Sequence, residues 1–288
     1  MFLQQIVNGL TMGVMYSLLA LGYSLIFGAL DFINFAHGQV AMFGAYVAWW
    51  ASVKAGMPFL VACALAIAAA AAVGIVMERF GFKPIRNAPK LAMITASVGF
   101  SYIVQTAVQL LFGTEPYAFT LGSAKVFHIG NVSFSTMHIG VLVISVALMV
   151  GLELFIKYTR PGRAIRAISL DKVCSGLMGV NVDSTVSLTF GIGSALGAFS
   201  CIMMSLYYSQ VYSTIGTSVG DKAFAAVVLG GAGSVPGAMI GGVVMGLVEA
   251  AAGTVLTSNV KEAVAYVVMI LVLIFKPSGL LGKEVKKD

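Results

Sequence analysis

Long apolar runs separated by short polar segments dominate the chain. A helix needs about 20 apolar residues to cross a lipid bilayer. The pattern therefore predicts an all-α, polytopic membrane protein with about seven to eight transmembrane helices, folded as a single transmembrane domain over residues 1–288. The runs cover residues 6–30, 39–53, 59–77, 91–112, 138–156, 184–208, 223–253 and 263–275.

The composition supports a membrane protein and excludes most other classes. Hydrophobic residues make up 59% of the chain and charged residues 10%, and the mean hydropathy is +0.97. Soluble domains carry about 25% charged residues, which excludes a cytosolic enzyme, a nucleic-acid-binding protein and a disordered scaffold. Cys63, Cys174 and Cys201 form no CxxC pair, so neither a disulfide nor a metal site is expected. The first 30 residues contain no Lys or Arg, so no cleavable signal is expected.

The positions of the basic residues predict the orientation in the membrane. Of the 17 basic residues, 13 fall in three stretches, at residues 79–90, 157–172 and 276–287. The positive-inside rule places all three in the cytoplasm. With every early run crossing the bilayer, the N-terminus lies outside and the C-terminus in the cytoplasm. Lys222 then belongs to an outer segment.

Two of the apolar runs are interrupted. Residues 29–38 contain Asp31, Asn34 and His37, and residues 223–253 contain the glycine-rich sequence LGGAGSVPGAMIGG. About nine residues precede the second break, and as a helix they cover only about 14 Å. We therefore expect residues 223–253 to re-enter the membrane as two half-helices. The alternative is a pair of tilted short spans joined by a cytoplasmic glycine loop. Two broken segments in one chain are typical of transporter cores.

The spans contain few ionisable groups, and none forms an acidic relay for ion-coupled transport. Asp31 and Glu249 lie near the ends of runs, where we expect their carboxylates to reach the membrane interface. No Walker A sequence is present, so this chain is not expected to hydrolyse ATP by that route. Any energy for transport then comes from a partner. The main alternative is a stand-alone channel or facilitator for a small polar solute such as urea.

One short motif offers a catalytic alternative. Residues 216–220 match G-x-S-x-G around Ser218. The match falls in a segment expected to be an external loop, whereas a hydrolase needs this serine on a strand-to-helix turn. Chance is the better explanation in a chain so rich in glycine and serine, and no catalytic residue is predicted.

The second basic stretch belongs to a long loop, residues 157–183, that carries a pattern of its own. Arg160, Arg163 and Arg166 recur every three residues, so on a helix they share one face. Asp171 then opens a short amphipathic stretch. A loop of this length is often functional, although a solvated loop that only orients the chain has the same composition.

Three stretches of the chain are distinctive: residues 8–38 ending in INFAHG, GRAIRAISLDK with GVN at residues 162–181, and KAFAAVVLGGAGSVPGAMIGG at residues 222–242. With these stretches the chain resembles the inner-membrane permeases of bacterial branched-chain amino-acid ABC transporters of the LivH type. The resemblance covers residues 3–282.

The resemblance implies a multi-pass subunit of the bacterial inner membrane that imports branched-chain or other hydrophobic amino acids by alternating access. Its implied partners are a second homologous permease, two ATP-binding subunits and a periplasmic substrate-binding protein. ATP and Mg²⁺ would be bound by the ATP-binding subunits, with no cofactor in this chain. Residues 157–183 would couple to the ATPase through Arg163, Arg166, Asp171, Lys172, Leu177 and Gly179. Candidate residues for the translocation pathway are Tyr23, Asn34, Phe35, His37, Gly38, Tyr46, Gly230, Gly231, Gly233 and Ser234.

Overall fold

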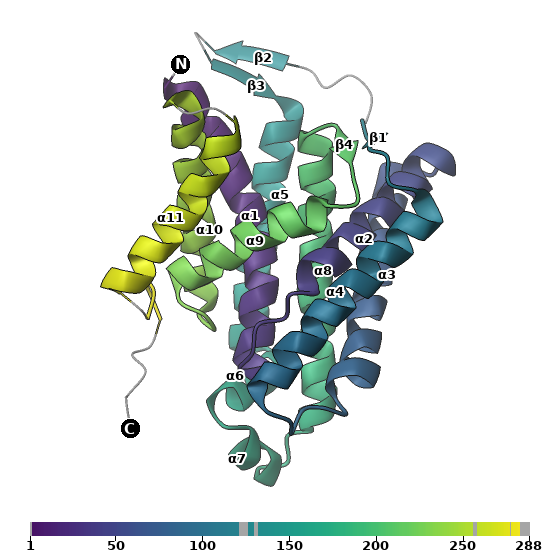
Figure 1. Ribbon diagram of the computed structural model, residues 1–288, viewed down its shortest axis with the longest axis vertical. Coiled ribbons are helices and arrows are strands. Elements are labelled where there is room, and N and C mark those ends of the chain that lie inside the picture. The colour runs from purple at the N-terminus through teal and green to yellow at the C-terminus, as the bar shows by residue number, and fades with distance from the viewer. Residues whose placement is uncertain (1, 121–125, 130–131, 256–257, 277, 283–288) are drawn as a thin grey trace.

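The computed structural model describes residues 2–120, 126–129, 132–255, 258–276 and 278–282, and helices account for most of them (Figure 1). This confirms the predicted all-α class. The helices are α1 (Phe2–Leu30), α2 (His37–Trp49), α3 (Phe59–Val76), α4 (Lys90–Phe112), α5 (Thr136–Tyr158), α6 (Arg160–Leu170), α7 (Lys172–Leu177), α8 (Val182–Tyr207), α9 (Ile215–Gly230), α10 (Val235–Val255) and α11 (Ser258–Phe275).

Helix α1 lies at the centre of the bundle and packs against α8 and α10. Its window of apolar residues is almost entirely buried, whereas α3, α4 and α5 expose most of theirs. Ser17 and Ser200 tie the central helices together, since their hydroxyls donate to the carbonyls of Met239 at 2.6 Å and Met15 at 2.6 Å. The polar side chains of the central helices therefore face protein rather than lipid.

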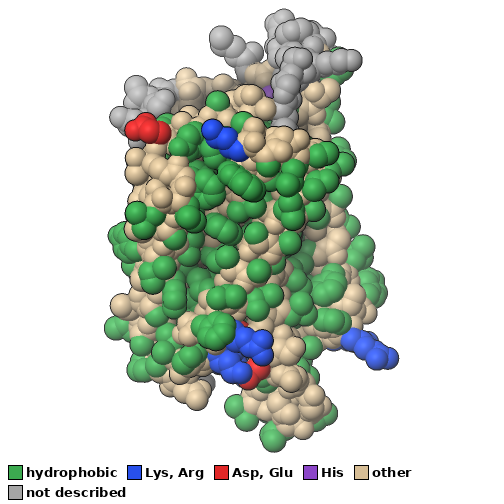
Figure 2. Space-filling model, turned by 90° about the vertical axis from the view of Figure 1, so that its right-hand side faces the viewer, with side chains coloured by type: hydrophobic (Ala, Val, Ile, Leu, Met, Phe, Trp, Pro, Cys, Tyr) green, Lys and Arg blue, Asp and Glu red, His purple; other side chains and the backbone are tan. Residues whose placement is uncertain are grey.

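Six helices, α1, α3, α4, α5, α8 and α10, are long and apolar enough to cross a membrane among the residues that the structure describes. Helices α2, α9 and α11 are shorter. Apolar side chains cover the middle of the face shown in Figure 2, and Lys, Arg, Asp and Glu gather mainly towards its ends. This banding is what a bilayer-spanning protein requires.

The first interruption of the apolar pattern has become a break between two helices. Helix α1 ends at Leu30, and the chain turns back through residues 31–36 before α2 begins at His37, well inside the bundle (Figure 1). Asn34 supports the start of α2, because its Oδ1 accepts from the backbone N–H of Ala36 at 3.1 Å. At its other end α2 continues into a π-helical turn, Trp50–Lys54.

The glycine-rich segment differs from the expected pair of half-helices. Helix α9 already begins at Ile215 and lies obliquely across the bundle, and α10 has 21 residues, which is a full span. The turn between them borders Lys157 and Arg166, which belong to the loop predicted to be cytoplasmic. The glycine turn thus lies at the end predicted to be cytoplasmic, as in the alternative with a glycine loop, although α9, with 16 residues, is shorter than a full span.

Short strands lie at the end of the molecule opposite α6 and α7 (Figure 1). Strand β1 (Tyr117–Ala118) pairs with β4 (Gln210–Val211), and β2 (Val126–Ile129) forms a hairpin with β3 (Val132–Ser135). Near them the Trp49 indole N–H donates to the carbonyl of Ala118 at 3.1 Å. This contact joins the outer part of α2 to the strand pair.

Candidate functional site

The two broken segments meet at a close crossing of α2 and α9. A Cβ atom added at Gly38 would lie 2.3 Å from the carbonyl oxygen of Gly216, and one added at Gly216 would lie 2.6 Å from the carbonyl oxygen of Gly38. Only glycine permits this approach of two backbones. The crossing brings the N-terminal ends of both helices to one place inside the bundle.

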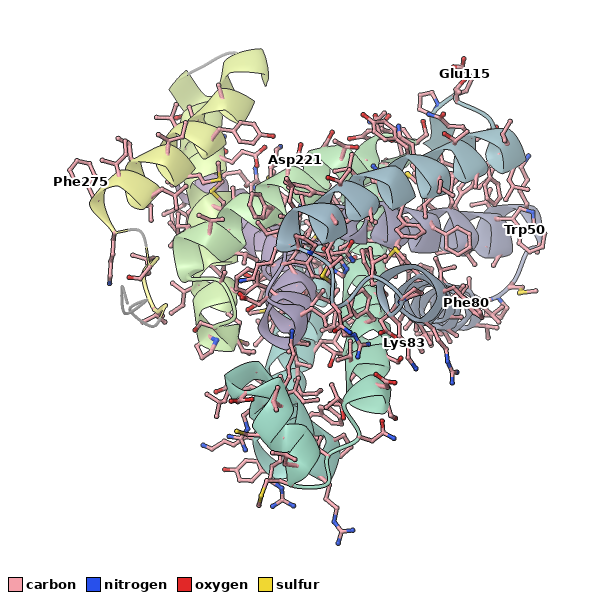
Figure 3. All side chains as sticks on the ribbon, turned by 60° about the horizontal axis from the view of Figure 1, so that its bottom comes forward. Trp50, Phe80, Lys83, Glu115, Asp221 and Phe275 are labelled. Atoms are coloured by element: carbon pink, nitrogen blue, oxygen red, sulfur yellow. The ribbon has the colours of Figure 1, made fainter. Side chains whose placement is uncertain are left out.

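A cavity of about 230 Å³ opens beside this crossing, and α1, α2, α4 and α9 contribute to its walls. The polar lining comes mainly from Gln39, Gln105, Thr217 and Asp221, and Figure 3 labels Asp221 on α9. The Gln39 amide Nε2 donates to Thr217 Oγ1 at 2.7 Å. The cavity thus combines hydrogen-bonding groups with one carboxylate. Its lining residues are Tyr23, Phe35, Gln39, Val98, Ser101, Tyr102, Gln105, Gly216, Thr217 and Asp221.

Five of the predicted pathway residues lie at or next to this cavity. Tyr23 and Phe35 line it directly. The ring of His37 packs edge-on against Tyr23, with centroids 4.7 Å apart. Gly38 forms the crossing with α9, and Asn34 lies buried in the turn before α2.

Tyr46 lies elsewhere, in an aromatic cluster at the outer part of α2. Its ring centroid is 5.2 Å from that of Phe112 and 6.4 Å from that of Trp49. Trp49 in turn stacks on Tyr117 at 4.3 Å. Tyr46 therefore packs α2 against α4 and does not line the cavity beside α9.

The glycine turn holds the other four predicted pathway residues, Gly230, Gly231, Gly233 and Ser234, at the far end of α9. Gly231 and Gly233 have positive φ angles of 103° and 82°, which reverse the chain between α9 and α10. Gly233 and Ser234 line a second cavity, of about 380 Å³, together with Asp31 and Ser169. These residues lie beside α6, away from the Tyr23 cavity.

The long basic loop folds into the two helices α6 and α7, which project from one end of the bundle (Figure 1). Thr159 caps α6, accepting from the N–H of Gly162 at 3.1 Å, and Ile165 and Ile168 bury its inner face. Arg163 and Arg166 lie on the exposed side. Of the predicted coupling residues, only Lys172 is half-buried.

Helix α7 presents an apolar tip to the surroundings. Leu177 is 83% exposed and Met178 85%, and Gly179 reverses the chain after them with a φ of 85°. Exposed apolar residues at the tip of a projecting element are typical of a protein–protein contact. The amphipathic stretch after Asp171 therefore ends in a protruding apolar knob formed by Leu177 and Met178, and its docking role stays a prediction.

Asp171 fixes the start of that helix. Its Oδ1 accepts from the backbone N–H of Cys174 at 2.9 Å. This hydrogen bond favours the ionised carboxylate and lowers the pKa of Asp171 below its usual range. The negative charge also complements the positive end of the α7 dipole. Asp171 thus shapes the knob that carries Leu177.

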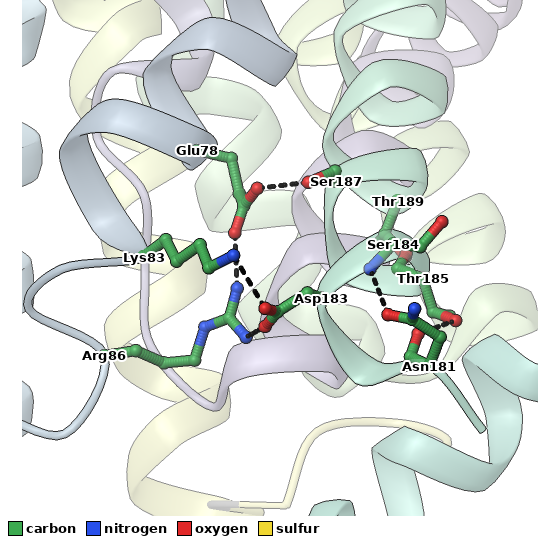
Figure 4. Close-up of polar contacts among 9 residues, drawn as sticks. All are labelled: Glu78, Lys83, Arg86, Asn181, Asp183, Ser184, Thr185, Ser187 and Thr189. Carbon is green, nitrogen blue, oxygen red and sulfur yellow. Dashed lines mark hydrogen bonds and ion pairs between the residues drawn. The ribbon is translucent and has the colours of Figure 1, made fainter. Parts of the chain in front are cut away.

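A charge network joins α8 to the turn after α3 and was not predicted from the sequence (Figure 4). Glu78 is fully buried; it accepts from Arg86 Nη2 at 2.5 Å and from the hydroxyl of Ser187. Asp183, at the start of α8, receives Arg86 Nη1 at 2.7 Å and Lys83 Nζ at 2.7 Å. The signal in the sequence was an acidic residue, Glu78, placed directly between the end of an apolar run at residue 77 and a basic stretch that begins at residue 79.

A second unpredicted ion pair lies inside the bundle. Lys222 Nζ lies 2.7 Å from Glu249 Oε1, and the Tyr16 hydroxyl donates to Glu249 Oε2 at 2.7 Å. Both expectations for these charges are wrong: Lys222 is 7% exposed rather than in an outer loop, and Glu249 is 2% exposed rather than at the interface. They stay buried because each neutralises the other.

Comparison with known proteins identifies the family. The family model described as branched-chain amino acid transport system, permease component, matches residues 5–273. The high-affinity branched-chain amino acid transport system permease protein LivH of Escherichia coli strain K12 is 39% identical to this chain, covering 99% of it and 97% of that protein. The corresponding permease protein BraD of Pseudomonas aeruginosa is 38% identical, over 99% of this chain and 98% of its own.

A solved structure supports the fold. PsaBC from Streptococcus pneumoniae, in complex with Fab, superimposes with a TM-score of 0.52 and covers 96% of this chain and 92% of its own, at 15% identity. That identity supports a shared fold alone. The sequence relatives support more than a shared fold, because they align with 99% of this chain at 38–39% identity. The chain is a multi-pass membrane protein that belongs to the family of branched-chain amino acid transport system permease components.

Proposed function

We propose that this chain is the permease subunit of an inner-membrane ABC importer that moves branched-chain amino acids into the cell. The observation that carries the proposal is the exposed apolar knob at Leu177 and Met178 on a chain of the permease family. A permease without its own ATP-binding motif needs a surface that an ATPase can move. The knob projects from the end predicted to face the cytoplasm.

The partners follow from this arrangement. One ATP-binding subunit docks on α6 and α7 of this chain, and a second docks on a homologous permease beside it. ATP and Mg²⁺ bind to those subunits, and this chain holds no cofactor. A periplasmic binding protein delivers the amino acid at the opposite end, where the strands lie.

Helix α9 links the docking knob to the pathway. Its C-terminal turn at Gly233 and Ser234 forms a cavity wall together with Arg166 of α6. Its N-terminal end forms the crossing with α2 at Gly38. When the ATPases close and shift α6, α9 carries that movement to the cavity lined by Tyr23 and Phe35. The permease pair then alternates between outward and inward openings.

The test replaces Leu177 by Asp in the assembled complex, reconstituted in proteoliposomes with ATP inside. Since a charge on the apolar tip disrupts a docked interface, uptake of radiolabelled leucine should fall at least tenfold. Asn87→Asp, an exposed position outside α6 and α7 and away from the strands, is the matched control and should leave uptake unchanged. Normal uptake by the Leu177 variant would reject the coupling surface. Solute entry through the purified chain alone, without ATP, would instead support a stand-alone facilitator.

A further inference from the structure

We infer that the cavity beside the α2–α9 crossing binds the charged ends of a zwitterionic amino acid in transit, with Asp221 holding its ammonium group. The inference rests on the proposed function and assigns a transit site within it. An ionisable residue inside a membrane protein is costly and usually functional. Asp221 is the carboxylate that lines this cavity.

Asp221 keeps its charge available to a ligand. Among the described residues it has no salt-bridge partner, and the hydroxyl of Tyr266 on α11 donates one hydrogen bond to it. The adjacent Lys222 does not neutralise it, because Lys222 pairs with Glu249 at 2.7 Å. Two adjacent residues of α9 therefore differ in their surroundings: Lys222 forms a buried ion pair with Glu249, whereas Asp221 lines the cavity.

Gln39 supplies an independent sign of a missing ligand. Its side chain is 2% exposed and lines the cavity, yet no described residue donates a hydrogen bond to its Oε1. A buried acceptor without a donor is unfavourable, because it has lost its hydrogen bonds to water. An ammonium group with three N–H donors has one for Gln39 Oε1 in addition to one for Asp221.

The opposite end of the zwitterion finds donors one turn away. Thr217 lies four residues before Asp221, about 6 Å along the helix, in the first turn of α9, and its hydroxyl can donate to a carboxylate while it accepts from Gln39. The positive end of the α9 dipole favours the same negative group. Gly216, beside it, also lines the cavity. The helix therefore offers an electropositive end and a carboxylate on one wall.

The remaining walls suit an aliphatic side chain. Phe35, Val98 and Tyr102 contribute apolar surface on the side towards α4. The volume of about 230 Å³ is below the range of about 300–1,000 Å³ that drug-sized ligands occupy, so it fits a small amino acid. The ligand is therefore held in one orientation, with its ammonium and carboxylate groups against α9 and its aliphatic side chain against the wall towards α4.

The experiment measures uptake and ATP hydrolysis together in the complete reconstituted importer. Asp221→Asn keeps the shape of the side chain but removes its charge, so leucine uptake should fall about tenfold. ATP hydrolysis stimulated by the binding protein should stay within twofold of wild type, because the coupling surface is intact. Asp221→Glu should recover part of the uptake. Glu115→Gln, an exposed carboxylate outside the cavity, is the matched control.

The outcomes separate this inference from the proposed function. If the wild-type complex takes up no leucine, the proposed function fails. If wild type transports and Asp221→Asn transports equally well, only the transit site is rejected. A parallel loss of uptake and stimulated ATP hydrolysis, with no recovery in Asp221→Glu, would make Asp221 structural and also overturn the inference.

A second measurement applies if Asp221→Asn does not assemble. Thr217→Cys, in a chain whose exposed Cys174 is replaced by Ser, places a thiol in the cavity wall. Leucine, supplied with the binding protein and ATP, should slow the reaction of this thiol with a methanethiosulfonate reagent at least threefold. No protection by leucine would reject a site at this wall.

Discussion

Glu249 lies between two donors inside the bundle, and this one carboxylate connects three helices. Lys222 reaches it from α9 and Tyr16 from α1. Two charges removed from water gain little net stability as a pair, but one charge left alone is strongly unfavourable. The pair therefore specifies how α9 sits against α1 and α10 more than it adds to the total free energy of folding.

Replacement of one partner of the ion pair tests whether a single buried charge is as unfavourable as this argument requires. Lys222→Met leaves Glu249 buried without its cation, which should lower the stability of the purified chain by about 3–5 kcal/mol. The double variant Lys222→Met with Glu249→Gln removes both charges and should recover most of the loss in a thermal unfolding measurement. A double variant as unstable as the single one would contradict the pairing.

Asp171 acts on the outside of the molecule through a helix cap. Its folded pKa is lowered by the Cys174 N–H, so the cap is complete above the ordinary pKa of an aspartate and is lost as the pH falls through the lowered value. At neutral pH, Asp171→Asn keeps the cap because asparagine also accepts from the backbone, whereas Asp171→Ala loses it.

We therefore expect Asp171→Ala to reduce the ATPase subunit retained on the purified permease several-fold, and Asp171→Asn to reduce it much less. Co-purification at pH 7 measures the difference. Equal losses would mean that the charge of Asp171, and not its cap, is what the partner needs.

At the scale of elements, the crossing of α2 and α9 is the tightest constraint on the cavity. The added methyl group of Gly38→Ala would meet the Gly216 carbonyl oxygen at 2.3 Å, and such overpacking costs about 1–3 kcal/mol. To avoid this contact α2 and α9 would have to move apart, which would widen the cavity. We therefore expect the Gly38→Ala variant to have lower thermal stability and at least a fivefold loss of leucine uptake. Gly151→Ala on α5 meets no atom within 4 Å and should retain both. A Gly38→Ala variant with normal uptake would show that the crossing tolerates displacement.

Most helices were predictable because an apolar run long enough to cross the bilayer is a specific sign of a membrane helix. The expected run at residues 91–112 differs from α4 by one residue, and the run at 59–77 differs from α3 by one. The start of α9 was missed because Gly216, Gly220, Asp221 and Lys222 read as a polar segment. A hydropathy scale scores each side chain by itself. It therefore carries no information about the ion pair between Lys222 and Glu249, which forms only in the folded protein.

The candidate site was predictable in part for a similar reason. The motif at residues 33–38 marks a local break, and breaks bring Asn34, His37 and Gly38 inside the bundle. Tyr46 has the same residue type as Tyr23 but lies more than two turns beyond the break, among Trp49 and Phe112. No pattern in one helix shows which neighbour each face will meet.

At the scale of the whole molecule, the exposed Cys174 belongs to α7 and the exposed Thr114 just precedes β1. These two elements lie at opposite ends of the bundle (Figure 1). The positive-inside rule predicts that the end with Cys174 faces the cytoplasm. In intact cells, a membrane-impermeant thiol reagent should label Thr114→Cys and leave Cys174 unlabelled until the membrane is permeabilised. Cys63 and Cys201 are buried and do not interfere. The reverse labelling pattern would invert the assigned orientation.

The central position of α1 also bears on how the protein is made. Helix α1 is synthesised well before α8 and α10, which enclose it, and it is apolar enough to enter the bilayer before they are made. Until then, Ser17 lacks the carbonyl of Met239, and the backbone of Met15 lacks the hydroxyl of Ser200. A nascent chain truncated before α8 is therefore inserted but incomplete. Its central helix stays without two of the hydrogen bonds that join it to later helices, so this part of the fold is complete only after α10 has been synthesised.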